Sequence, residues 1–181
     1  MKRRRFLSSV GIILPAAMVS TEFFLSSCNA DVKEEYFSDK NIKLLDEIGE
    51  TIIPATASSP GAKEARIGEF MKVYVTDCYP PEEQNIFWEG VNKIKKNSKS
   101  KYGNEFPKLA LLQKQEILLS LKNESKIDSN TPQFYPMVKD LVVFGFFTSK
   151  PGSTKALRYI QTPGYYKGDV PYKKGDKAWA T

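Results

Sequence analysis

Apolar residues recur along most of this chain at the three- and four-residue spacing of an α-helix, and no long segment alternates at the two-residue period of a strand. The first example is Ile42, Leu45, Ile48 and Ile52, after which Pro54 ends the pattern. Proline lacks a backbone donor, so it lies in the first turn of a helix or beyond its end. This spacing predicts an all-α fold.

Four more segments follow the same spacing and predict a compact domain of about five helices. The helices are expected at about 39–53, 65–78, 81–94, 109–121 and 133–147. The lysine-rich run 93–104 after the third is interpreted as a solvated helix end and loop rather than a binding site. In the fourth helix, Leu112, Ile117, Leu118 and Leu121 are expected to form the buried face.

The fifth segment is apolar on nearly every side. It is expected to start at Thr131-Pro132 and to end with Phe144, Phe146 and Phe147. A helix of this kind is buried, either in the core of its own domain or under a partner. The sequence leaves both possibilities open for the three phenylalanines.

From Pro151 onward the chain is rich in glycine, proline and aromatic residues, with little helical periodicity beyond a short piece near 155–159. A segment of this composition cannot bury its own rings efficiently. We therefore expect an extended, aromatic-rich C-terminal tail that lies on another surface.

The first 27 residues have the composition of an export signal. Arg3 and Arg4, followed after one residue by Phe6 and Leu7, resemble a twin-arginine signal. The apolar run at 10–19 has the length typical of a signal peptide and is shorter than the roughly 20 residues of a membrane-spanning helix. An ordinary Sec signal also begins with basic residues and remains the alternative.

Cys28 follows Leu25-Ser26-Ser27, an arrangement that resembles the lipobox of bacterial lipoproteins. In such proteins the cysteine is lipidated and becomes the new N-terminus. The alternative is an ordinary buried cysteine or half of a disulfide. We expect a signal peptide over 1–27, a tether over 28–38 and a helical domain over 39–181, and hence an exported lipoprotein anchored on the periplasmic side of a membrane.

Removal of this signal changes the charge of the chain. The net charge falls from +6 to +3, with 23 basic against 20 acidic residues left after position 27. This is an ordinary surface, so no nucleic-acid partner is expected. With Cys28 lipidated, Cys78 is alone and no disulfide within the chain is possible.

The residues that usually perform catalysis are scarce. The chain has no histidine, the commonest general base and nitrogen ligand for metals. It has no glycine-rich nucleotide motif. Asp46 and Glu50 share a helix face and could hold a metal or act as an acid–base pair, but a solvated polar face is the favoured interpretation. The chain is therefore not expected to be an enzyme by itself.

Five ordered blocks resemble the gluconate 2-dehydrogenase subunit 3 family. They are LLDEIGETIIPAT (44–56), PGAKEA (60–65), DCYPPEEQ (77–84), FGFFTSKPGSTKALRY (144–159) and PGYYKGDVPYKKGDKAWA (163–180). The resemblance covers roughly 42–181. It departs from the family at Gly168-Asp169, where many members have a cysteine, which makes a disulfide role for Cys78 doubtful.

The resemblance implies a non-catalytic small subunit of an exported dehydrogenase complex. The large subunit, of the glucose-methanol-choline oxidoreductase type, would hold FAD and the catalytic histidine and oxidise a sugar or polyol. No cofactor is expected in this chain, and some such complexes also contain a cytochrome c subunit. In related systems the small subunit carries the twin-arginine signal for both chains.

We expect the partner contact to use aromatic residues and arginine, the commonest anchors of protein interfaces. The candidates are Phe144, Phe146, Phe147, Arg158, Tyr159, Tyr165, Tyr172 and Trp179. Two further hypotheses remain: an envelope lipoprotein that acts alone as a ligand-binding or structural protein, and, less favoured, an enzyme with a carboxylate-centred site. A neighbouring gene for a flavoprotein dehydrogenase without its own signal would favour the subunit hypothesis.

Overall fold

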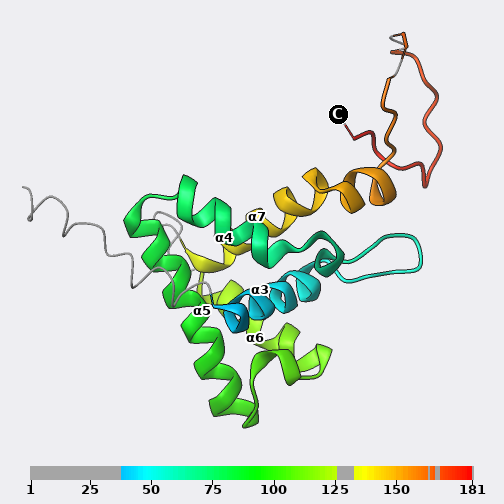
Figure 1. Ribbon diagram of the computed structural model, residues 1–181. Helices are drawn as coiled ribbons and strands as arrows, with labels where there is room; N and C mark the ends of the chain where they lie inside the picture. The colour runs from blue at the N-terminus through cyan, green and yellow to red at the C-terminus, as the bar shows by residue number, and fades with distance from the viewer. Residues whose placement is uncertain (1–37, 126–132, 163, 166–167, 181) are drawn as a thin grey trace, which may run out of the picture. The chain divides into compact units, whose positions relative to one another are not determined.

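A computed structural model describes residues 38–125, 133–162, 164–165 and 168–180. The chain divides into two units, 1–36 and 37–181, and the second contains every helix described below. All regular elements among the described residues are helices (Figure 1), which confirms the all-α prediction. The expected signal residues Arg3, Arg4, Phe6 and Leu7, the lipidation site Cys28, the tether and the Thr131-Pro132 helix start lie outside the described residues.

The first two helices of the domain pack closely against each other (Figure 1). Helix α3 spans Asp39–Ile52 and α4 spans Ile67–Cys78, with the short 3₁₀ turn η1 at Ala62–Ala65 between them. Their shared core includes Leu45 and Ile48 from α3 and Met71 and Val75 from α4, all with no exposed surface. Both helices end close to their predicted positions.

Helix α5 is longer than expected. It spans Pro81–Tyr102 and continues through most of the lysine-rich run, so the prediction of a loop there is wrong. Ile94 and Ser98 lie one turn apart on the buried face, and the Ser98 hydroxyl donates to the Ile94 carbonyl at 2.7 Å. Gly103 ends the helix with a φ of 68°, the left-handed conformation that glycine adopts without strain.

Helix α6 spans Leu111–Glu124 and α7 spans Phe134–Thr148, and the 3₁₀ turn η2 at Phe106–Lys108 precedes α6. The predicted face of α6 is correct for Ile117, Leu118 and Leu121, which are buried. It is wrong for Leu112, which is 78% exposed. Helix α7 contacts α3, α4, α5 and α6, so the most apolar helix is the one with the most neighbours.

The segment after α7 starts with a single π-helical turn, η3, at Gly152–Ala156. It continues as an irregular tail that makes one backbone pairing. The Arg158 N–H donates to Ala178 at 2.8 Å, and the Ala180 N–H donates to Arg158 at 3.0 Å, which pairs residues 158 and 179 in parallel. This agrees with the predicted extended, aromatic-rich tail, which closes into a loop through this pairing.

Candidate protein-binding surface

Four aromatic rings gather where α4 packs against α7. The ring of Tyr74 lies 5.5 Å from Phe70, 5.7 Å from Tyr79 and 5.8 Å from Phe144, measured between centroids. Phe70 and Phe144 lie 5.9 Å apart. The ring pairs are tilted or edge-to-face, which is the favoured geometry for aromatic pairs. We call Phe70, Tyr74, Tyr79 and Phe144 the aromatic cluster.

The aromatic cluster is only partly covered by the domain. Phe144 is 52% exposed, and Phe70, Tyr74 and Tyr79 are half-buried. Burial, followed by the neighbouring Tyr74, Glu83 and Asp140, raises the pKa of Tyr79, so its hydroxyl keeps its proton at neutral pH. The cluster therefore presents apolar ring faces together with a phenolic donor.

Gly145 explains how α4 can approach α7 so closely at this point. A Cβ atom at Gly145 would lie 2.5 Å from the Phe70 ring, closer than packed carbon atoms can come. Because Gly145 has no side chain, Phe70 lies directly against the backbone of α7. The neighbouring Phe144 is thereby placed against both Phe70 and Tyr74.

The three phenylalanines of α7 separate into two environments. Phe144 and Phe147 are exposed, whereas Phe146 is 1% exposed and belongs to the core. Phe146 is therefore unavailable to a partner, and its inclusion in the predicted interface is wrong. The reason is helical geometry, since residue 146 lies on the same face as Val142, which is fully buried.

The tail places two predicted interface residues in contact with each other. The Arg158 guanidinium lies 4.1 Å from the centre of the Trp179 indole, within the range of a cation–π interaction. The remaining predicted tail residues, Tyr159, Tyr165 and Tyr172, are exposed. The structure thus joins Arg158 and Trp179, and it shows no ring contact between the tail and the aromatic cluster among the described residues.

The sequence interpretation missed three members of the aromatic cluster. Phe70, Tyr74 and Tyr79 are absent from the predicted interface residues. The four-residue spacing of Phe70 and Tyr74 places both on one helix face. Only the position of Phe144 on another helix shows that this face is half open.

Two carboxylates of α3 bind the backbone of the connection to α4 and of the first turn of α4. Asp46 accepts a hydrogen bond from the Gly68 N–H at 2.8 Å, and Glu50 accepts from the Ala55 and Lys63 N–H groups, both at 2.9 Å. These contacts replace the solvated polar face that the sequence suggested. They also give a physical reason for the block LLDEIGETIIPAT, because its acidic residues bind the backbone of the segment that comes next.

Glu47 has a different role from Asp46 and Glu50, because it pairs with two lysines. Its carboxylate binds Lys63 and Lys114, the latter at 2.9 Å with only 12% of the lysine side chain exposed. Burial alone would raise the pKa of Glu47, but the hydrogen bonds and charges of the two lysines lower it below its ordinary 4.5. The balance is reversed at Asp46, where burial outweighs the hydrogen bond from the Gly68 N–H and raises the pKa of the carboxyl group.

Glu47→Gln is expected to destabilise the domain by about 1–3 kcal/mol at neutral pH, because the largely buried Lys114 side chain loses its charged partner. Because the pKa of Glu47 is lower in the folded state, its ionised form stabilises the fold at pH values above the ordinary pKa of 4.5. This stabilisation is lost as the pH falls below that value. The deficit should therefore shrink near pH 3. Urea unfolding of both proteins at pH 7 and pH 3 measures it.

Glu124→Gln is the matched control, because the Lys93–Glu124 pair is about half exposed on both sides. Its cost should stay below about 1 kcal/mol at either pH. Equal losses in the two variants at pH 7 would contradict a structural role for Glu47.

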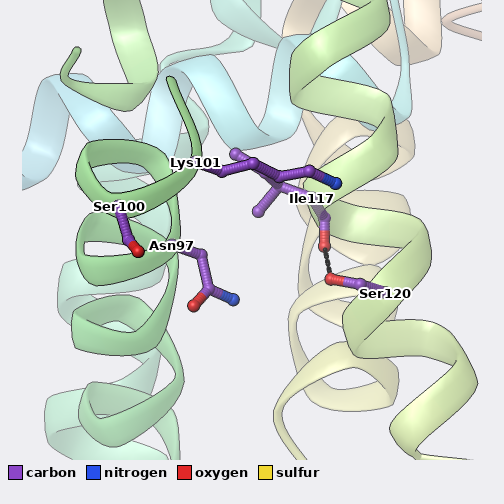
Figure 2. A pocket seen from close by; sticks show the side chains of 5 residues that line it. All are labelled: Asn97, Ser100, Lys101, Ile117 and Ser120. Carbon is purple, nitrogen blue, oxygen red and sulfur yellow. Dashed lines mark hydrogen bonds between the residues drawn. The ribbon is translucent and has the colours of Figure 1, made fainter. Parts of the chain in front are cut away.

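A small polar cavity of about 130 Å³ lies between α5 and α6 (Figure 2). Asn97, Ser100 and Lys101 line it from α5, and Ile117 and Ser120 from α6. Lys101 bonds Glu116, and Ser120 donates to the Ile117 carbonyl at 2.7 Å, so these groups already have partners. Among the described residues, no group of three or more acidic or cysteine side chains could hold a metal ion.

These features define the class of protein: a small all-α domain with a half-open aromatic cluster and a looped aromatic tail. Residues 20–164 match the family model described as gluconate 2-dehydrogenase subunit 3, so the chain belongs to that family. The match includes four of the five blocks and ends before most of the fifth, 163–180. The family consists of accessory, non-catalytic subunits of a dehydrogenase complex. No curated protein and no solved structure matches the chain.

Proposed function

We propose that this chain is the small subunit of an exported FAD-dependent dehydrogenase complex. In this role it stabilises the flavoprotein subunit, escorts it through export and anchors it to a membrane. The match of residues 20–164 to the gluconate 2-dehydrogenase subunit 3 family carries the proposal. The match favours this role over that of an envelope lipoprotein without an oxidoreductase partner.

The proposed contact with the flavoprotein centres on Phe144 of the aromatic cluster. Phe144 is 52% exposed on a helix that otherwise supplies much of the core, and its ring is held in place by Phe70 and Tyr74. A rigid, half-exposed aromatic group is typical of an interface anchor, because it gains contact area with little loss of entropy. Phe147 extends the same exposed side of α7.

The tail supplies the second part of the proposed contact. The Arg158–Trp179 pair holds the two ends of a loop that carries Tyr159, Tyr165 and Tyr172 at its surface. Together these residues offer rings and a guanidinium to a partner. We propose that they lie on the flavoprotein when the complex forms.

The proposal divides the chemistry between the chains. FAD and the catalytic histidine belong to the large subunit, of the glucose-methanol-choline oxidoreductase type, which oxidises a sugar, a polyol or gluconate. This chain contributes no histidine and no expected cofactor. A cytochrome c subunit would accept electrons in complexes that contain one.

Export and anchoring are assigned to the N-terminal segment. Arg3, Arg4, Phe6 and Leu7 act as a twin-arginine signal, the type used by proteins exported in the folded state. Cys28 receives the lipid after the signal is removed. No helix among the described residues is long and apolar enough to cross a membrane, and in this proposal the lipid on Cys28 provides the attachment.

Phe144→Ala is expected to weaken co-purification of the flavoprotein at least tenfold, because it removes the central exposed ring of the proposed contact. The measurement is a pull-down of the tagged mature protein from cells that also produce the dehydrogenase, with FAD absorbance as the readout. Leu112→Ala is the control, since Leu112 is 78% exposed on α6 and lies outside the aromatic cluster.

The melting temperature of each variant separates binding from stability, because Phe144 also contacts Phe70 and Tyr74. Recovery of the wild-type protein without any flavoprotein, together with normal flavoprotein export in a deletion strain, would overturn the proposed function. Equal recovery with Phe144→Ala and Leu112→Ala would remove the aromatic cluster from the contact.

A further inference from the structure

A second surface of the domain is strongly basic. A pocket of about 450 Å³ lies where α3, α5 and η2 meet, and four of its nine lining residues are lysines. Lys40 and Lys43 come from the first turns of α3, and Lys95 and Lys99 from the last turns of α5. These four lysines define the lysine pocket. The two pairs lie more than 50 positions apart in the sequence and meet only through folding.

The charge of the lysine pocket is poorly balanced by the domain itself. Among the described residues, no carboxylate forms an ion pair with Lys40, Lys43 or Lys99. Glu105 also lines the pocket and pairs with Lys108 at 3.9 Å. An anionic ligand would therefore meet an excess of positive charge.

The floor of the lysine pocket is apolar. Leu44 and Phe106 line it and are at least 97% buried, and the buried Asn41 adds one polar side chain. Basic groups around an apolar floor match a phospholipid, whose phosphate lies next to its glycerol and acyl groups. A free phosphate would use only the charged part of this surface.

The position of the lysine pocket in the chain points to the same ligand. Lys40 and Lys43 follow directly after the 28–38 segment, which in the proposed function joins the domain to a lipid on Cys28. Fully extended, these eleven residues would span at most roughly 40 Å. The tether thus keeps the start of α3 close to the membrane surface.

We propose that the lysine pocket binds the headgroup of an anionic phospholipid and thereby sets the orientation of the anchored domain on the membrane. The inference rests on the proposed lipid anchor, but it assigns a separate contact. Lysines near an anionic membrane surface contribute additively to binding.

The test is co-sedimentation of the mature chain, residues 28–181 with Cys28→Ser, with vesicles in the absence of the flavoprotein. All described helices lie in this part of the chain. Binding is expected to vesicles that contain phosphatidylglycerol and not to pure phosphatidylcholine. The triple variant Lys40→Gln, Lys43→Gln, Lys99→Gln should bind roughly 100-fold more weakly, because three charges are lost.

The matched control is Lys72→Gln, Lys122→Gln, Lys139→Gln, which removes the same charge from exposed lysines outside the pocket. It should retain binding within about twofold. Equal losses in both triple variants, no binding to phosphatidylglycerol, or full competition by millimolar inorganic phosphate would each overturn the proposal. So would a pocket variant that binds vesicles normally but loses the flavoprotein. A failed flavoprotein pull-down leaves this assay unaffected, so the two proposals fail separately.

Discussion

Phe146→Ala is expected to destabilise the domain by about 3–5 kcal/mol, the range for removal of a large aromatic side chain from a core. Phe146 is 1% exposed and lies on the buried face of α7, the helix that contacts all four others among the described residues. Neighbouring side chains cannot fill the cavity without moving several helices. Urea or thermal unfolding of the mature protein measures the loss.

Phe147→Ala is the control for this prediction. The two residues are adjacent, and their rings lie 5.1 Å apart, but Phe147 is 39% exposed. Removal of the Phe147 ring loses one aromatic pair and the contacts of a partly exposed side chain, so it should lower the free energy of unfolding by only about 1 kcal/mol. Similar losses for the two variants would mean that α7 does not present Phe146 to the core as described.

Replacing both Arg3 and Arg4 with lysine is expected to abolish export of the dehydrogenase in the proposed system. Lysine keeps the positive charge but lacks the planar guanidinium, so the two side chains are not interchangeable where recognition depends on that group. A Sec signal requires only the charge and would tolerate the change. The measurement is dehydrogenase activity in separated periplasmic and cytoplasmic fractions.

Arg5→Lys provides the matched control, because it makes the same substitution at a neighbouring basic position that directly follows the arginine pair. Activity should remain periplasmic in this variant and move to the cytoplasm in the double variant. Unchanged periplasmic activity after replacement of Arg3 and Arg4 would contradict co-export through a twin-arginine signal.

Helical periodicity predicted the elements of this fold well where one helix face is clearly apolar. Leu45 and Ile48 of α3 and Ile117 and Leu121 of α6 are buried as expected. The errors arise where neighbouring elements decide the outcome. Leu112 is apolar and fits the helical spacing, but its side chain is exposed. Helix α6 begins at Leu111, and both leucines of its first turn lie outside the core.

In the lysine-rich run, neighbouring elements likewise decided the outcome, here in favour of a helix. Its composition favoured a solvated helix end and loop, yet α5 continues to Tyr102, with Ile94 and Ser98 buried and outer lysines paired with α6. Lys93 pairs with Glu124 and Lys101 with Glu116. The sequence of one helix does not predict such pairs, because the two partners are separated by 15 or more residues and lie on different helices.

The sequence by itself determined the all-α class, the family and the absence of histidine, because these depend on residue identity and local spacing. Tertiary structure alone decided that Phe146 is core while Phe144 is surface, and that α3 carboxylates bind the backbone of η1 and of the first turn of α4. It also brought four lysines from two helices to one pocket. Exposure and charge clustering depend on which helix packs against which, and that information is not contained in the periodicity of any one segment.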